Sequence, residues 1–186
     1  PFYRANELRD YYNELTLRFK KDWNVEFRAY NDGIAYRFVS RSKKPFNVVD
    51  ETVDYRFPSD MVASVPYVKA GKDGDYESQY FNSFENTYTT DRLSKLNKKR
   101  LMFLPLVVDA GEGVKICITE SGLENYPGLY LSAAEGENRL TGQFAPYPKK
   151  TVQGGHNQLQ MLVKERENYI AKTSGTRSFP WRAFII

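Results

Sequence analysis

The chain has 186 residues, and its 27 basic and 23 acidic side chains give a formal net charge of only +4. That mild excess argues against a nucleic-acid partner, because such domains gather their basic charge on one face or helix, whereas the densest basic run here (95–100) reads as a solvated loop. A single cysteine, Cys117, excludes an internal disulfide, and no apolar run is long enough to span a membrane.

The first third of the chain alternates apolar and polar residues with a period of two. Apolar residues take the odd positions in 14–19 and in 25–29, a pattern that places one face of a strand on a core and the other in water. Asn31-Asp32-Gly33 then predicts a tight turn, because Asp-Gly tolerates positive φ, and 34–39 alternates again. Residues 23–40 are therefore predicted to form a β-hairpin.

Further short strands are predicted along the rest of the chain. They are Thr52–Phe57, Met61–Val68, Leu101–Val108, Val114–Thr119, Tyr130–Ala133, Met161–Ala171 and Ala183–Ile186. Glycine-rich turns separate some of them, at 71–75 and 109–113, and one helical turn is expected at Ser121–Glu124 from its capping-box spacing. Many short strands with turns between them predict an all-β sandwich or barrel.

The two ends of the chain predict an incomplete domain. It opens on Pro1-Phe2-Tyr3 and closes on the apolar run Ala183–Ile186, with no polar cap or turn after it. We expect residues 184–186 to lie in or beside an edge strand whose neighbour is missing, which would make the isolated domain prone to association.

Residues that could carry chemistry are few. The only histidine is His156, which lies among glycines. One histidine and one cysteine are too few for a zinc cluster, and the glycines around His156 argue against a serine triad. Among carboxylates, Glu85 lies in a polar stretch and Glu120 follows the apolar strand 114–118, with Glu124 and Tyr126 close behind. A carboxylate at a strand end suits a ligand or a hard cation such as Ca²⁺, although spacing alone favours a solvated turn.

Three ordered stretches carry a family resemblance. They are 13–17 with 27–38, the run 118–131 from Ile118-Thr119-Glu120 to Tyr130-Leu131, and 173–182, which ends in Phe179-Pro180-Trp181-Arg182. In order and spacing they resemble the N-terminal domain of glycoside hydrolase family 97, and the resemblance covers essentially the whole chain.

The resemblance implies a fold, a setting and a site. The fold would be a β-super-sandwich like that of the galactose mutarotases, with residues 1–186 as the N-terminal domain of an enzyme that continues into a catalytic (β/α)₈ barrel. The enzyme would be a periplasmic α-glucosidase or α-galactosidase that acts on an oligosaccharide and binds Ca²⁺. Glu120 would be the calcium ligand lent by this domain, while the acid and base carboxylates would belong to the barrel, so this segment alone would be inactive.

Several alternatives stay open at this stage. The best-represented role of the family favours an α-glucosidase, although the residues that distinguish the two sugars lie outside this chain. A stand-alone carbohydrate-binding module would suit the 14 tyrosines equally well, because their rings stack on sugars. Glu85 and Tyr126 are weak candidates for substrate contacts.

Overall fold

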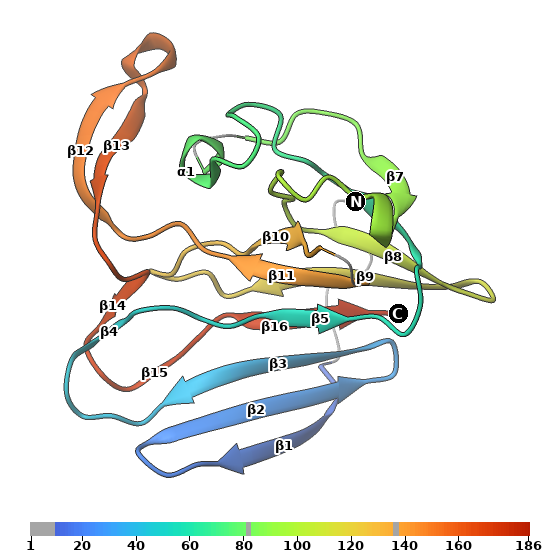
Figure 1. Cartoon of the computed structure of the whole chain (residues 1–186). Coiled ribbons are helices and arrows are strands. Elements are labelled where there is room, and N and C mark those ends of the chain that lie inside the picture. Colours follow the sequence, from blue (N-terminus) through green and yellow to red (C-terminus); the bar gives the residue numbers. More distant parts are fainter. Residues whose placement is uncertain (1–9, 81–82, 136–137) are drawn as a thin grey trace, which may run out of the picture.

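A computed structural model describes residues 10–80, 83–135 and 138–186, which excludes the opening residues Pro1–Tyr3. The regular structure of the described chain is mostly β-strand, with one short α-helix and two short 3-10 helices (Figure 1). In chain order the elements are β1 (Asn13–Arg18), β2 (Trp23–Tyr30), β3 (Gly33–Ser40), β4 (Phe46–Val48), β5 (Asp54–Arg56), β6 (Val62–Val65), α1 (Tyr76–Gln79), β7 (Thr89–Arg92), η1 (Leu93–Lys95), β8 (Leu106–Gly111), β9 (Val114–Ser121), β10 (Tyr130–Ala133), β11 (Arg139–Gln143), β12 (Pro148–Gly154), η2 (His156–Gln158), β13 (Gln160–Arg166), β14 (Ala171–Thr173), β15 (Arg177–Ser178) and β16 (Trp181–Ile185).

One large antiparallel sheet forms the base of the domain. Its strand order is β1-β2-β3-β16-β9-β8-β6-β7, and β15 pairs with the end of β3. The C-terminal strand β16 therefore lies between the N-terminal hairpin and the β8–β9 hairpin. The all-β class is confirmed. Strands overlap the predicted ranges, but the one predicted over Leu101–Val108 begins only at Leu106 and continues to Gly111, into the predicted turn at 109–113.

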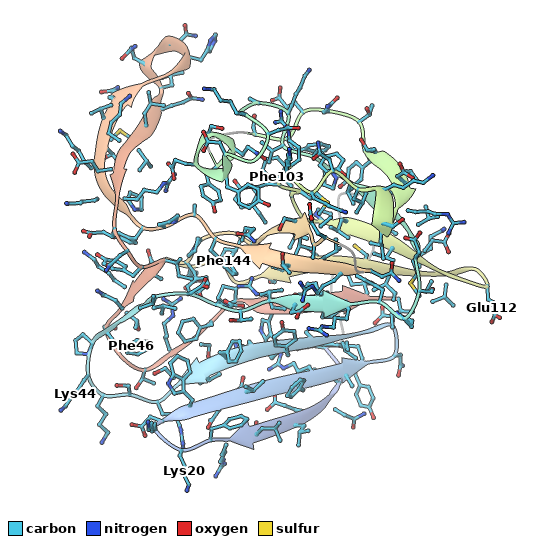
Figure 2. All side chains as sticks on the ribbon, in the orientation of Figure 1. Lys20, Lys44, Phe46, Phe103, Glu112 and Phe144 are labelled. Atoms are coloured by element: carbon cyan, nitrogen blue, oxygen red, sulfur yellow. The ribbon has the colours of Figure 1, made fainter. Side chains whose placement is uncertain are left out.

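A smaller sheet of order β10-β11-β5 covers part of the large sheet. The buried cluster between the layers takes Leu106, Val108 and Ile118 from the large sheet and Leu131 and Leu140 from the small one. Figure 2 shows side chains filling the space between these layers. This two-layer arrangement is the predicted sandwich.

Two smaller pairs of strands complete the structure. Strands β4 and β14 pair at one end of the sandwich, and β12 and β13 form a long hairpin that projects from the body (Figure 1). The single strand predicted over Met161–Ala171 is two strands here. Strand β13 ends at Arg166, one further bond joins the Glu167 N–H to the Tyr147 carbonyl, and β14 begins only at Ala171.

The predicted hairpin at 23–40 is confirmed, but its glycine has a different physical reason. None of Asn31, Asp32 and Gly33 has a positive φ. A Cβ atom at Gly33 would lie 2.3 Å from the carbonyl oxygen of Phe184 on the neighbouring strand β16. Gly33 is therefore required by the close approach of β16 rather than by the turn.

Two local predictions are wrong. Ser121–Glu124 forms no helical turn, because Gly122 has a φ of 77° and turns the chain out of β9. The helix lies instead at Tyr76–Gln79, where the Asp75 side chain accepts a hydrogen bond from the Ser78 backbone N–H. None of the described helices is long and apolar enough to cross a membrane.

The expectation that residues 184–186 lie at an open edge is also wrong. Phe184 is in β16, which has β3 on one side and β9 on the other. An uncovered apolar surface lies on β1 and β2, where Leu15, Leu17 and Phe27 are 57%, 41% and 39% exposed. Alternation therefore predicted the strands correctly, but the described chain lays no second layer over this part of the sheet (Figure 1).

We predict that this uncovered face drives self-association of the 186-residue chain. The double substitution Leu15→Thr/Leu17→Thr removes apolar surface from β1 but keeps β-propensity. We expect a lower mass by size-exclusion chromatography with light scattering, and a change in the free energy of unfolding of at most about 0.5 kcal/mol per site. Val114→Thr, an exposed apolar residue on β9, is the matched control and should leave the mass unchanged. A monomeric parent chain at high concentration would contradict the prediction.

Candidate functional site

Glu120 lies inside a strand rather than on a solvated turn. Strand β9 continues to Ser121, and Glu120 pairs in register with Arg182 of β16. Its side chain is 9% exposed and lies on the same face of β9 as the core residue Ile118. Glu120 was expected at the open end of a strand, but its side chain is largely buried.

The carboxylate of Glu120 is fixed by two donors. Arg182 Nη1 donates to Oε2 at 2.5 Å, and the backbone N–H of Leu129 donates to Oε1 and Oε2 at 3.0 and 3.1 Å. A carboxylate has about four acceptor positions, so these contacts leave it with capacity for a further partner.

Arg182 joins Glu120 to a second carboxylate that the sequence did not single out. Its Nε and Nη2 donate to Glu51 Oε1 and Oε2 at 2.9 and 2.8 Å, which is a bidentate pair. Arg182 is 1% exposed and Glu51 is 7% exposed in their side chains, and the guanidinium lies 5.3 Å from the ring of Phe144 (labelled in Figure 2). Glu51 comes from the segment between β4 and β5, so the pair links the two layers.

Of the two weak substrate candidates, the structure brings only Tyr126 into this network. Its hydroxyl donates to Glu51 Oε2 at 2.9 Å. Burial, and then the charge of Glu51, raise the pKa of Tyr126, so it is a neutral donor throughout the physiological range. Glu85 is exposed in the loop between α1 and β7, and His156 is exposed at the tip of the projecting β12–β13 hairpin.

The network carries an excess of negative charge. Two carboxylates, Glu51 and Glu120, face one guanidinium. Burial disfavours the charge of Arg182, but the hydrogen bonds and charges of the two carboxylates outweigh it and raise the Arg182 pKa. Burial raises the pKa of Glu120, against the opposing effect of Arg182. A cation beside Glu120 would offset both the desolvation and the excess charge.

Glu120 also borders a hollow of about 410 Å³. Phe103 and Tyr130 line the hollow with rings whose centroids are 5.3 Å apart, and Gly128 lies against Oε1 with no side chain to fill the space. No group of three or more histidine, cysteine, aspartate or glutamate residues gathers in the described parts of the chain to hold a metal ion. The Glu120 carboxylate could supply one oxygen to a calcium ion, which takes six to eight, so the described residues do not form a complete calcium shell by themselves.

Sequence patterns indicated only part of this site. Glu120 and Arg182 both lie in the stretches that carry the family resemblance, but nothing in the pattern paired them. Glu51 was missed because it is 131 residues from Arg182 along the chain and sits in a polar stretch that reads as a loop.

Comparisons with known proteins agree with this architecture. The Glycosyl-hydrolase 97 N-terminal family model matches residues 1–186, and the chain therefore belongs to that family. It is 79% identical over 186 residues to a protein of Bacteroides thetaiotaomicron named retaining alpha-galactosidase. The chain spans 28% of that relative's length.

Solved structures share the fold at low sequence identity. A glycoside hydrolase family 97 enzyme variant from Pseudoalteromonas sp. strain K8 superposes with a TM-score of 0.65 at 17% identity, over 95% of this chain and 23% of that one. A beta-arabinopyranosidase gives a TM-score of 0.60 at 19% identity, over 94% of this chain and 27% of that one. The chain thus has the β-sandwich fold of the Glycosyl-hydrolase 97 N-terminal family.

We predict that Arg182→Ala destabilises the domain by about 3–5 kcal/mol, because it leaves two buried carboxylates without their shared cation. Urea unfolding measures this, with Lys115→Ala as the control: the Lys115–Asp109 pair is exposed, so its loss should change the free energy of unfolding far less.

The pH dependence of the Arg182→Ala deficit provides a second test. Without Arg182, the already raised pKa of Glu120 rises further, so the folded variant binds a proton more tightly than the unfolded chain. The deficit should be largest at neutral pH and shrink as the pH falls through that raised pKa. A deficit independent of pH would mean that lost packing, rather than uncompensated charge, causes the instability.

Proposed function

We propose that this chain is the N-terminal domain of a calcium-dependent α-galactosidase and that Glu120 supplies one of the calcium ligands. The observation that carries the proposal is the excess negative charge of the Glu51–Arg182–Glu120 network beside a hollow. The remaining calcium ligands, and the carboxylates that cleave the glycosidic bond, would come from the rest of a longer protein.

The residues of this chain would act by holding and shielding the site. Arg182 and the Leu129 N–H fix the Glu120 carboxylate, so little reorganisation is needed when a ligand arrives. Phe103 and Tyr130 present aromatic rings to the hollow, a surface suited to the C–H face of a sugar. When bound, calcium would orient the substrate and offset negative charge that develops on oxygen.

The relative at 79% identity favours a galactoside over a glucoside. The expectation of an α-glucosidase came from the commonest role in the family, whereas the relative's printed name is a retaining alpha-galactosidase. Retaining cleavage uses a nucleophilic carboxylate and an acid–base carboxylate about 5 Å apart. The two largely buried carboxylates described here both engage Arg182, which suits a binding role rather than these catalytic roles.

We predict that the full-length protein hydrolyses an aryl α-galactoside in preference to the matching α-glucoside, and that the 186-residue chain hydrolyses neither. Loss of general acid–base assistance alone lowers rates by about 10²–10⁴-fold. Release of the aryl group, measured for both proteins and both substrates, tests the two statements. Turnover by the isolated chain above a buffer blank would overturn the second, and a preference for the glucoside would overturn the first.

We predict that Glu120→Gln in the full-length protein weakens calcium binding at least tenfold, since the amide loses the ligand's charge. Excess calcium should restore part of the lost rate. The amide oxygen can still accept from Leu129 and Arg182 keeps Glu51, so the free energy of unfolding should fall by only about 1 kcal/mol. Calorimetric calcium titration measures the affinity. Equal affinities in variant and parent would remove Glu120 from the calcium site.

A further inference from the structure

Glu51 is a buried carboxylate for which the proposed function gives no direct task. It is absent from the lining of the hollow beside Glu120, and both of its oxygens are engaged. Oε1 accepts from Arg182 Nε, while Oε2 accepts from Arg182 Nη2 and from the Tyr126 hydroxyl. Because both Glu51 oxygens accept from Arg182, the hydrogen-bonded path from Glu51 to Glu120 passes through Arg182.

The first part of that effect is geometric. A guanidinium is planar, so its donors keep fixed directions relative to one another. Glu51 accepts hydrogen bonds from Nε and Nη2, and the remaining terminal nitrogen, Nη1, donates to Glu120. The orientation of the Glu120 carboxylate is therefore set on one side by Leu129 and on the other by a cation that Glu51 holds in place.

The second part is electrostatic. Arg182 alone would neutralise Glu120 and reduce its attraction for a cation. With Glu51 on the opposite edge of the guanidinium, the positive charge is already offset, and Glu120 keeps an unbalanced negative charge beside the hollow. The burial of all three side chains limits screening by solvent, so the effect extends across the network.

We infer that Glu51 is a positioning residue for the proposed calcium ligand: through Arg182 it fixes the Glu120 carboxylate and preserves its negative charge without contacting the metal. The inference rests on the proposed role of Glu120. Direct partners of a metal ligand, the place that Arg182 takes here, change metal affinity about 10–100-fold when they are substituted, and Glu51 lies one contact further out.

The test is Glu51→Gln in the full-length protein, titrated with CaCl₂ by calorimetry after removal of metal with EDTA. The glutamine keeps the shape but lets Arg182 neutralise Glu120, so we expect a Kd about tenfold higher than that of the parent, the low end of the range for direct partners of a ligand. Glu26→Gln is the matched control, because Glu26 also pairs with an arginine of the same sheet, Arg37, and should leave the Kd unchanged.

The double variant Glu51→Gln/Glu120→Gln shows whether Glu51 acts through Glu120. If it does, the double variant binds calcium as weakly as Glu120→Gln alone, because residues in one network are not additive. Fully additive losses would overturn the inference. If Glu120→Gln itself leaves the Kd unchanged, the proposed function fails; if Glu120→Gln weakens binding and folded Glu51→Gln does not, only the present inference fails.

Tyr126→Phe keeps the inference testable if Glu51→Gln does not fold. It removes the hydroxyl donor to Glu51 and retains all three charged groups. We expect a weaker calcium affinity, by less than Glu51→Gln causes, because Glu51 keeps its charge but is held in place by one hydrogen bond fewer. Thermal unfolding of the metal-free proteins separates the two kinds of role: a lower melting temperature with unchanged calcium affinity would mean that Glu51 and Tyr126 only stabilise the fold, and would overturn the inference.

Discussion

The burial of one charged side chain constrains the arrangement of both layers. Arg182 belongs to the central strand β16 of the large sheet and is 1% exposed, so its charge must be met inside the protein. Glu120 meets it from the neighbouring strand, and Glu51 meets it from the segment that leads into the covering sheet. The small sheet cannot shift over the large one without separating Arg182 from Glu51, which ties the packing of the sandwich to the geometry of the candidate site.

One face of the large sheet changes character from one edge toward the other. A row of register partners crosses it from Leu15 through Phe27, Tyr36 and Arg182 to Glu120. Leu15 and Phe27 are exposed, whereas Arg182 and Glu120 are largely buried under the second layer. The same face of the sheet is thus an exposed apolar surface at one end and a buried charged surface at the other. The difference arises because the second layer covers only the end that carries Arg182 and Glu120.

The described residues of the candidate site form one side of a hollow and do not make up a complete active site. Its two largely buried carboxylates share one guanidinium, its hollow is lined by aromatic rings, and no metal-binding cluster of three gathers in the described residues. These features agree with a family in which the matched domain spans 28% of a longer glycosidase relative.

The sequence by itself determined the local structure: alternation at 14–19, 25–29 and 34–39 indicated strands, and the ordered stretches indicated the family and Glu120. Three predictions were wrong. Gly33 is required by the close approach of β16, and Gly122, with a positive φ, prevents a helical turn at Ser121–Glu124. Residues 184–186 are not at an open edge, because β16 is inserted between β3 and β9. Only the tertiary structure joined Glu51 to Arg182 across 131 residues. Periodicity fixes which face a side chain takes along its own strand, whereas the partner it meets there depends on which distant segment packs over that face.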